Sequence, residues 1–263
     1  MTFEKITYDV SESVATISFN DPATMNAAGI DTAQEMLLAF EMAADEARAT
    51  ILTGAGKGFC SGANLSGGGP AKAEAQGKPD AGKALDQYYN PWISVMRNHP
   101  HPIISAVNGA AAGVGCSIAL MGDLVLASEN AYFLQAFRRI GLVPDGGSTW
   151  LLPRNIGKAR AMEMALIGDK IPAEKALDWG LINRIYPADQ LMTEARNLAT
   201  ELAKGPTVSL SMIRSLIWDG WEQGFQDQLH AERNAQRTAG RTDDFKEGVS
   251  AFLQKRPANF VGK

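Results

Sequence analysis

Thr50-Ile51-Leu52-Thr53, closed by the turn Gly54-Ala55-Gly56, is the stretch from which the fold of this chain is best inferred. A short apolar run that ends in glycines is typical of a buried strand. Before it, residues 30–47 carry apolar side chains at helical spacing, and residues 13–19 alternate as a strand that forms a hairpin with residues 3–9. Strand, helix and strand in this order indicate a right-handed crossover and a partly parallel sheet.

Strands and helices alternate up to about residue 185, and the chain is helical thereafter. The further predicted strands span 103–107, 124–127, 131–134 and 181–185. The predicted helices span 84–98, 113–121, 189–203, 207–219, 224–238 and 242–254. The last helices carry apolar side chains without strands to cover, so we expect residues 191–263 to cover the core and to contribute to oligomerisation. Residues 1–190 are expected to form the core with the active site.

Composition excludes several classes of function. The net charge of -4 provides no broad basic field, so nucleic acid is not expected as a partner. Cys60 and Cys116 lie in separate Gly-rich segments, and no apolar run reaches the roughly 18 residues of a membrane span. Together with a polar start, these features predict a cytoplasmic protein that does not contact the membrane.

Residues 66–83 are rich in Gly, Ala, Lys and Pro and show no hydrophobic period. They predict a mobile loop. Long loops beside a site often close over it, so a lid and a plain solvent-exposed connection both remain open.

Two Gly-rich segments, 58–65 and 108–116, each place a glycine before a run of small residues. Backbone N–H groups at such turns have no intrahelical partner, and the helix dipole adds partial positive charge. Two converging N–H groups from Gly62 and Gly113 turns would stabilise a negative oxygen such as that of an enolate. The alternative is tight strand-to-helix packing, for which glycine provides room.

The segment Ile140-Gly141-Leu142-Val143-Pro144-Asp145-Gly146-Gly147-Ser148 holds one carboxylate at the mouth of a Gly-rich turn. Asp145 is a candidate general acid/base on a rigid turn. It is equally placed to be the N-cap of a helix that starts near residue 146.

Other chemistries lack their motifs. Lys57 in a phosphate-loop-like turn is followed by neither Ser nor Thr, and no G-x-G-x-x-G follows a strand, so ATP and NAD are not supported. Residues 115–119 miss the serine-hydrolase nucleophile elbow by one glycine, and His230 is the one histidine after them. His99 and His101 bracket a proline, and neither cysteine has a C-x-x-C partner, so no metal site is predicted.

These segments together resemble the crotonase superfamily, the enoyl-CoA hydratase/isomerase family, over residues 3–260. The landmarks that carry the resemblance are Met25-Asn26-Ala27, Phe59–Leu65, Asn108-Gly109, Gly113, Asp123, Gly141–Thr149, Pro153 and Ala176–Ile182. Residues 135–145 look closest to the phenylacetate-pathway branch, the ring-epoxide (oxepin-forming) phenylacetyl-CoA isomerases. The resemblance implies an α/β fold, a crotonase-like spiral of ββα repeats with a C-terminal helical region, and a homotrimer or dimer of trimers.

The resemblance also implies a CoA thioester substrate whose carbonyl oxygen is bound by two backbone N–H groups, those of Ser61 and Val114 by motif position. It implies that the substrate or its CoA contacts Ala27, Gly62, Ala63, Asn64, Leu65 and Gly113. Asn64 is a departure, because many members carry Asp there.

The catalytic positions of the family distinguish its reactions. Its hydratases hold a water between two glutamates, and the matching positions here are Ser117 and Phe137, which have no carboxylate. Asp145 matches the position at which isomerases of the family place their acid/base residue. We therefore expect an acyl-CoA isomerase, acting by double-bond shift or on 1,2-epoxyphenylacetyl-CoA, with no cofactor beyond the CoA of the substrate. An enoyl-CoA hydratase and a non-catalytic CoA-binding protein remain as alternatives.

Overall fold

The computed structural model describes residues 2–65, 74–75 and 78–263 of the 263-residue chain. Within this part the larger sheet has six strands, in the spatial order β1 (Ile6–Ser11), β2 (Val14–Phe19), β3 (Ala49–Gly54), β7 (Ile103–Val107), β9 (Leu124–Ser128) and β12 (Arg184–Tyr186). β1 and β2 form the predicted antiparallel hairpin, and every later neighbour pair is parallel. The helix between β2 and β3 is α1 (Ile30–Glu46), so the predicted crossover to a parallel strand is confirmed.

A second, smaller sheet lies beside the first and was not predicted. Its order in the described residues is β11 (Ile171–Pro172), β10 (Tyr132–Leu134), β8 (Ala110–Ala112) and β4 (Gly58–Cys60). β4, β8 and β10 run parallel to one another, and β11 pairs antiparallel with β10. This sheet brings the two Gly-rich segments together, because β4 and β8 are neighbours in it.

Three strands of the larger sheet, β3, β7 and β9, are each followed by a strand of the smaller sheet and then by helix. β3 and β4 precede α2 (Ala81–Ala84), the π-helical turn η3 (Leu85–Tyr89) and α3 (Asn90–Arg97). β7 and β8 precede α4 (Val114–Ala119), and β9 and β10 precede the 3-10 turn η4 (Phe137–Ile140), α5 (Ser148–Ile167) and α6 (Ala173–Asp178). Successive units advance one strand along both sheets, which confirms the expected spiral of ββα repeats.

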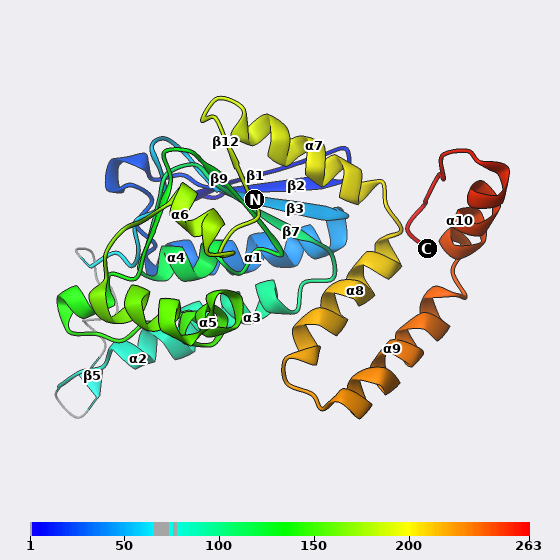
Figure 1. Ribbon diagram of the computed structural model, residues 1–263. Coiled ribbons are helices and arrows are strands. Elements are labelled where there is room, and N and C mark those ends of the chain that lie inside the picture. Colours follow the sequence, from blue (N-terminus) through cyan, green and yellow to red (C-terminus); the bar gives the residue numbers. More distant parts are fainter. Residues whose placement is uncertain (1, 66–73, 76–77) are drawn as a thin grey trace.

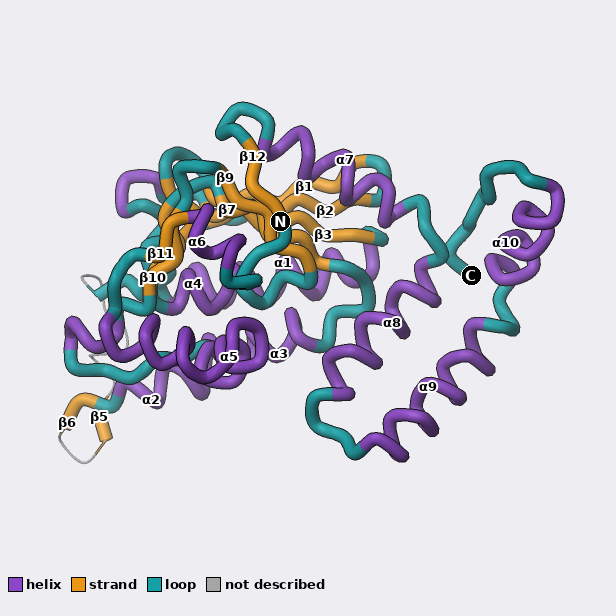
Figure 2. The backbone as a smooth tube through the Cα atoms, in the orientation of Figure 1, coloured by secondary structure: helices purple, strands orange, loops and turns teal. Residues whose placement is uncertain are grey.

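Helices cover both faces of the larger sheet. β3 is buried along its whole length. One face packs on α1, through residues such as Met36 and Phe40. The other face packs on α7 (Leu191–Ala203), which lies along the larger sheet in Figure 2. Its Ala195, Ala199 and Ala203 share one buried cluster with side chains of four strands. The prediction that the helices after residue 190 have no strands to cover is therefore wrong for α7, which completes the core.

The three remaining helices extend away from the sheets as an arm: α8 (Thr207–Gly220), α9 (Phe225–Ala239) and α10 (Asp243–Gln254) (Figure 1). α8 is tied to the core by Arg214, whose Nε lies 2.7 Å from Oδ2 of Asp123. Trp218 donates from Nε1 to the other carboxylate oxygen at 2.9 Å. α7 thus belongs with the core and α8, α9 and α10 form the arm, while the predicted boundary at residue 190 stays a prediction.

The predicted loop 66–83 is covered by the structure only in part, because residues 66–73 and 76–77 lie outside the described residues. Within the described part, β5 (Glu74–Ala75) pairs antiparallel with β6 (Lys78–Pro79). α2 begins at Ala81, where the carboxylate of Asp80 caps the N–H groups of Gly82 and Lys83. The loop prediction is therefore wrong for residues 81–83, and the lid stays a prediction. Each helix in the described ranges is too short or too polar to cross a bilayer.

Candidate active site

The two Gly-rich turns touch at the point where β4 and β8 end. Gly62 (φ +111°) and Gly113 (φ +54°) both have left-handed backbone conformations, which favour glycine. A Cβ atom added at Gly62 would lie 3.0 Å from the carbonyl oxygen of Ala112. A Cβ atom added at Gly113 would lie 3.7 Å from Cα of Gly62. The backbone conformation therefore favours glycine at both positions, and at Gly62 the nearby Ala112 carbonyl leaves little room for a side chain, so the packing interpretation holds alongside any functional one.

The residue after each glycine has a free backbone N–H group. The N–H groups of Ala63 and Val114 have no hydrogen-bond partner among the residues that the structure describes. Val114 is the first residue of α4, where the helix leaves its N–H without an intrahelical acceptor. Ser61, in contrast, donates its N–H to the carbonyl of Met25 at 3.0 Å. The prediction that Ser61 provides an oxyanion donor is therefore wrong, and the geometry favours Ala63 in its place.

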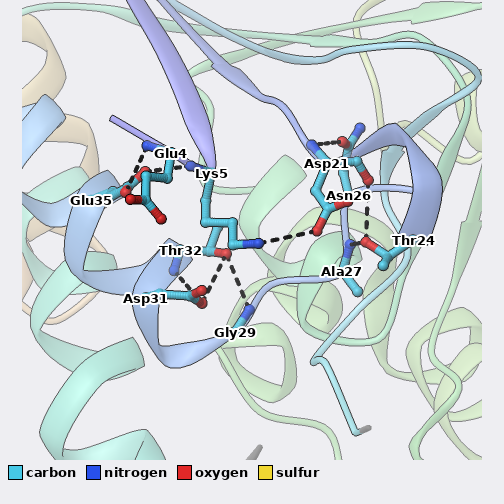
Figure 3. Close-up of polar contacts among 10 residues, drawn as sticks. All are labelled: Glu4, Lys5, Asp21, Thr24, Asn26, Ala27, Gly29, Asp31, Thr32 and Glu35. Carbon is cyan, nitrogen blue, oxygen red and sulfur yellow. Dashed lines mark hydrogen bonds and ion pairs between the residues drawn. The ribbon is translucent and has the colours of Figure 1, made fainter. Parts of the chain in front are cut away.

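The turn before α1 holds the Gly62–Leu65 segment in place. Ala28 donates its N–H to the carbonyl of Gly62 at 2.8 Å and accepts the N–H of Asn64 at 2.9 Å. Asn26, in a left-handed conformation (φ +60°), accepts the N–H of Asp21 at 2.9 Å, as Figure 3 shows. The N–H of Ala27 is taken by Thr24, so Ala27 has only its carbonyl and methyl group to offer a ligand (Figure 3).

Asp145 is not a helix cap. α5 begins at Ser148, and its N-cap is Gly147 in a left-handed conformation (φ +78°). The backbone carbonyl of Asp145 accepts the hydroxyls of Ser117 at 2.8 Å and Ser148 at 2.9 Å. Its carboxylate accepts no hydrogen bond from the described residues, and one of its oxygens is buried. The backbone is fixed while the carboxylate is unpaired, which is the arrangement that a general base needs.

Burial sets the proton affinity of this carboxyl group. Loss of water around Asp145 raises its pKa from an ordinary 3.8 to about 6. A pKa near the working pH suits a group that must both accept and return a proton. At pH 7 roughly nine in ten molecules carry the ionised, basic form.

Ser117 and Val114 lie three residues apart on α4. The hydrogen bond from Ser117 to the Asp145 carbonyl therefore links the Asp145 turn to the helix that carries the Val114 N–H. Ser117 is fully buried, and a Cβ atom at Gly146 would lie only 2.7 Å from its Cβ. Phe137 is also buried, and its Cζ lies 4.0 Å from the position of a Cβ on Gly113. The two positions expected to lack carboxylates thus both lie against the candidate site. Ser117 holds the Asp145 turn by its hydrogen bond, and Phe137 places the edge of its ring near Gly113.

Apolar side chains that belong to the same segments are exposed to solvent. They are Met25, Leu65, Ile140, Leu142 and Val143. Val143, the most exposed at 78%, is two residues from Asp145. Exposed apolar groups next to a free carboxylate are typical of a surface that a partly apolar ligand covers.

The histidines do not contribute to this site. His99 and His101 are buried against α1, where their Nε2 atoms face the carbonyls of Phe40 at 3.2 Å and Ala43 at 2.8 Å. Burial lowers the pKa of His99 to about 3, so it is neutral at physiological pH. Both are core residues of the α1 interface.

Comparisons with known proteins identify the family. Residues 9–263 match the family described as Enoyl-CoA hydratase/isomerase. The chain is 41% identical over 263 residues to a probable enoyl-CoA hydratase of Rhodobacter capsulatus, with all of both chains covered. It is 40% identical over 267 residues to the 1,2-epoxyphenylacetyl-CoA isomerase of Escherichia coli, with 99% of each chain covered.

A crystal structure of a putative enoyl-CoA hydratase/isomerase from Mycobacterium abscessus superimposes with a TM-score of 0.91 at 32% identity, covering 98% of this chain and 100% of that one. The spiral of ββα units and the helical C-terminal region therefore match the crotonase fold. The full-length match in sequence and in structure establishes that this chain belongs to the enoyl-CoA hydratase/isomerase family.

Proposed function

We propose that the protein is an acyl-CoA isomerase that uses one carboxylate, Asp145, and two backbone N–H groups, those of Ala63 and Val114. The observation that supports it most directly is the unpaired, half-buried carboxylate of Asp145 on a turn tethered to α4. The first N–H of that same helix is free. A base and an oxyanion donor are thus held by one short rigid element.

The proposed reaction shifts a double bond in two proton transfers. The two N–H groups bind the thioester oxygen, and Asp145 removes a proton from the carbon next to the carbonyl of a 3-enoyl thioester. The electron pair moves onto the oxygen as a dienolate, which the N–H groups stabilise. The protonated Asp145 then returns the proton to the γ carbon, and the double bond becomes conjugated with the thioester. Atoms and electrons balance, and no water is consumed.

Hydration would need a second group to bind and activate water. Neither Ser117 nor Phe137 carries a carboxylate, and the Ser117 hydroxyl already donates to the Asp145 carbonyl. The relative from Rhodobacter capsulatus is nonetheless named a probable hydratase. Hydratase activity is therefore the alternative that the experiment must distinguish.

The test compares two Asp→Asn variants on a 3-enoyl-CoA substrate. Asp145→Asn is expected to lower turnover by at least about 100-fold, the scale of a lost general acid/base. Asp31→Asn is the matched control, because its carboxylate is exposed and already accepts the N–H of Thr32 at 2.8 Å. Unchanged turnover in Asp145→Asn refutes the base. Equal loss in both variants also refutes it, because the effect would not be specific to Asp145. A 3-hydroxyacyl-CoA product favours the hydratase, and acyl-CoA binding without any turnover favours a non-catalytic role.

For the substrate we favour aromatic ring epoxides, because the isomerase from Escherichia coli that shares 40% identity is named for 1,2-epoxyphenylacetyl-CoA. The same base and oxyanion donors would assist epoxide opening and rearrangement. A panel of aliphatic enoyl-CoA and aromatic acyl-CoA substrates ranks the two classes by kcat/KM. A preference for aliphatic chains would contradict the aromatic assignment and leave the isomerase intact.

We also propose that the arm mediates self-association into a trimer or a dimer of trimers. Large apolar side chains are exposed along it, among them Phe225 at 75% and Phe252 at 83%. Such a surface is rarely left to solvent. Light scattering coupled to size-exclusion chromatography gives the mass in solution, and a monomer at micromolar concentration contradicts the proposal.

A further inference from the structure

The side chain of Tyr89 lies behind the turn that carries Ala63. It is only 1% exposed, and its hydroxyl donates to the carbonyl of Ala28 at 2.7 Å. Tyr89 ends the π-helical turn η3, which continues directly into α3. A π-helical turn contains one extra residue, so it changes which side chains face inward, and such turns are frequent at functional sites.

The carbonyl of Ala28 is a shared acceptor. It accepts the N–H of Asn64 at 2.9 Å in addition to the Tyr89 hydroxyl, while the N–H of Ala28 donates to Gly62 at 2.8 Å. Ala28 therefore bonds the residue before Ala63 and the residue after it. The position of the Ala63 N–H depends on Ala28, and the position of the Ala28 carbonyl depends on Tyr89.

Burial and the Asp145 carboxylate both affect the pKa of the Tyr89 phenol. Burial is the main cause that raises the pKa of Tyr89, and the charges of Cys60, Asp145 and Asp31 raise it further. The phenol therefore remains protonated and keeps donating to Ala28 throughout the physiological pH range.

We propose that Tyr89 is a positioning residue for the oxyanion hole. Its hydroxyl fixes the Ala28 carbonyl, and Ala28 in turn keeps the Ala63 N–H directed at the place where the thioester oxygen gains negative charge. The inference rests on the proposed function and adds a residue to it that does not touch the substrate. Without the hydroxyl, the Ala28 carbonyl keeps the Asn64 N–H as a partner, so the chain should fold but hold the turn less firmly.

The test compares Tyr89→Phe with Tyr8→Phe. Tyr8 is the matched control, because its hydroxyl also makes one hydrogen bond, to Glu46 at 2.8 Å, on the hairpin. Two readouts report the oxyanion hole: the split between kcat and KM, and the infrared carbonyl frequency of a bound saturated acyl-CoA, which falls as the N–H groups polarise the thioester. Tyr89→Phe is expected to lower kcat about tenfold, less than the loss of a whole oxyanion donor, with KM within about twofold.

In Tyr89→Phe the carbonyl frequency should return part of the way to its value in water, and amide exchange should become faster at residues 63–65. Tyr8→Phe should change none of these quantities. Full turnover and an unchanged carbonyl frequency in Tyr89→Phe overturn the inference, and so does a Tyr89→Phe chain that fails to fold, because the hydroxyl would then be needed for stability.

Other results would show that the proposed function itself is wrong. In that case the wild-type protein turns over no enoyl-CoA, or Asp145→Asn keeps its turnover. Asp145→Asn should leave the carbonyl frequency of the bound thioester lowered, because it does not alter the N–H groups. The two variants thus separate the base from the oxyanion hole.

Discussion

Replacing Asp145 by Asn should make the protein more stable at neutral pH while it abolishes isomerisation. In the folded protein the carboxyl group loses water and gains no hydrogen bond from the described residues, so its ionisation is unfavourable there. The pKa rises from 3.8 to about 6 on folding. At about 1.4 kcal/mol for each pH unit, this difference corresponds to an upper limit of about 3 kcal/mol. Partial exposure of the side chain reduces the expected gain to about 1–2 kcal/mol.

The stability that Asp145→Asn gains over the wild type should increase as the pH rises. Below about pH 4 the carboxyl group is protonated in both the folded and the unfolded chain, so the wild type and the variant differ little. Between about pH 4 and pH 6 the folded wild type binds more protons than the unfolded chain, and its stability falls as the pH rises. Above about pH 6 the full penalty is present, and the advantage of the variant reaches its plateau.

Urea denaturation across this pH range, followed by circular dichroism, measures the effect for the wild type, Asp145→Asn and the control Asp86→Asn. Asp86 is exposed on η3, and its replacement should leave stability nearly unchanged. A variant at position 145 that is less stable than the wild type at pH 7, or whose advantage does not vary with pH, would refute the account of an unpaired, desolvated carboxylate.

Three further substitutions test the supports of the site and of the arm. Gly146→Ala should cost about 2–4 kcal/mol of unfolding free energy, because a Cβ there would lie 2.7 Å from that of Ser117 at a φ of +61°; an unchanged melting temperature would contradict this. Ser117→Ala should change stability by no more than about 1 kcal/mol, since the Asp145 carbonyl keeps other donors, yet lower kcat several-fold with KM unchanged. Arg214→Met should cost about 3 kcal/mol in denaturant titrations, because it leaves Asp123 without its buried cation; a neutral result would show that the ion pair does not hold the arm.

Periodicity predicted the regular part of this fold well. The hairpin, α1, β3 and the four C-terminal helices lie within a few residues of their predicted bounds, because each is long enough for one face to show its apolar spacing. The smaller sheet was not predicted, because its strands are too short to show a periodic pattern. β4, β8 and β11 are only two or three residues long, so their pairing depends on tertiary contacts and leaves no alternation in the sequence.

The role of α7 was also hidden. Its buried face consists of Leu191 and three alanines at four-residue spacing, which pack on the larger sheet. In the sequence this face resembles any amphipathic helix, and nothing local distinguishes a helix that covers a sheet from one that extends away.

The site was predicted to the level of the segment but not of the atom. Gly62, Gly113 and Asp145 were identified because glycine and a lone carboxylate are visible in the sequence. Whether the N–H of Ser61 or that of Ala63 can bind a ligand depends on the hydrogen bond from Ser61 to Met25, a contact between residues 36 positions apart. The role of Tyr89 could not be predicted, since no sequence pattern shows that its hydroxyl donates to the Ala28 carbonyl.

Product analysis in labelled water distinguishes proton transfer by one carboxylate from the addition of water. A 3-enoyl-CoA should yield its conjugated isomer by mass spectrometry, with no oxygen taken from the solvent. Rapid appearance of a 3-hydroxyacyl-CoA that carries the labelled oxygen would contradict the account and establish a hydratase.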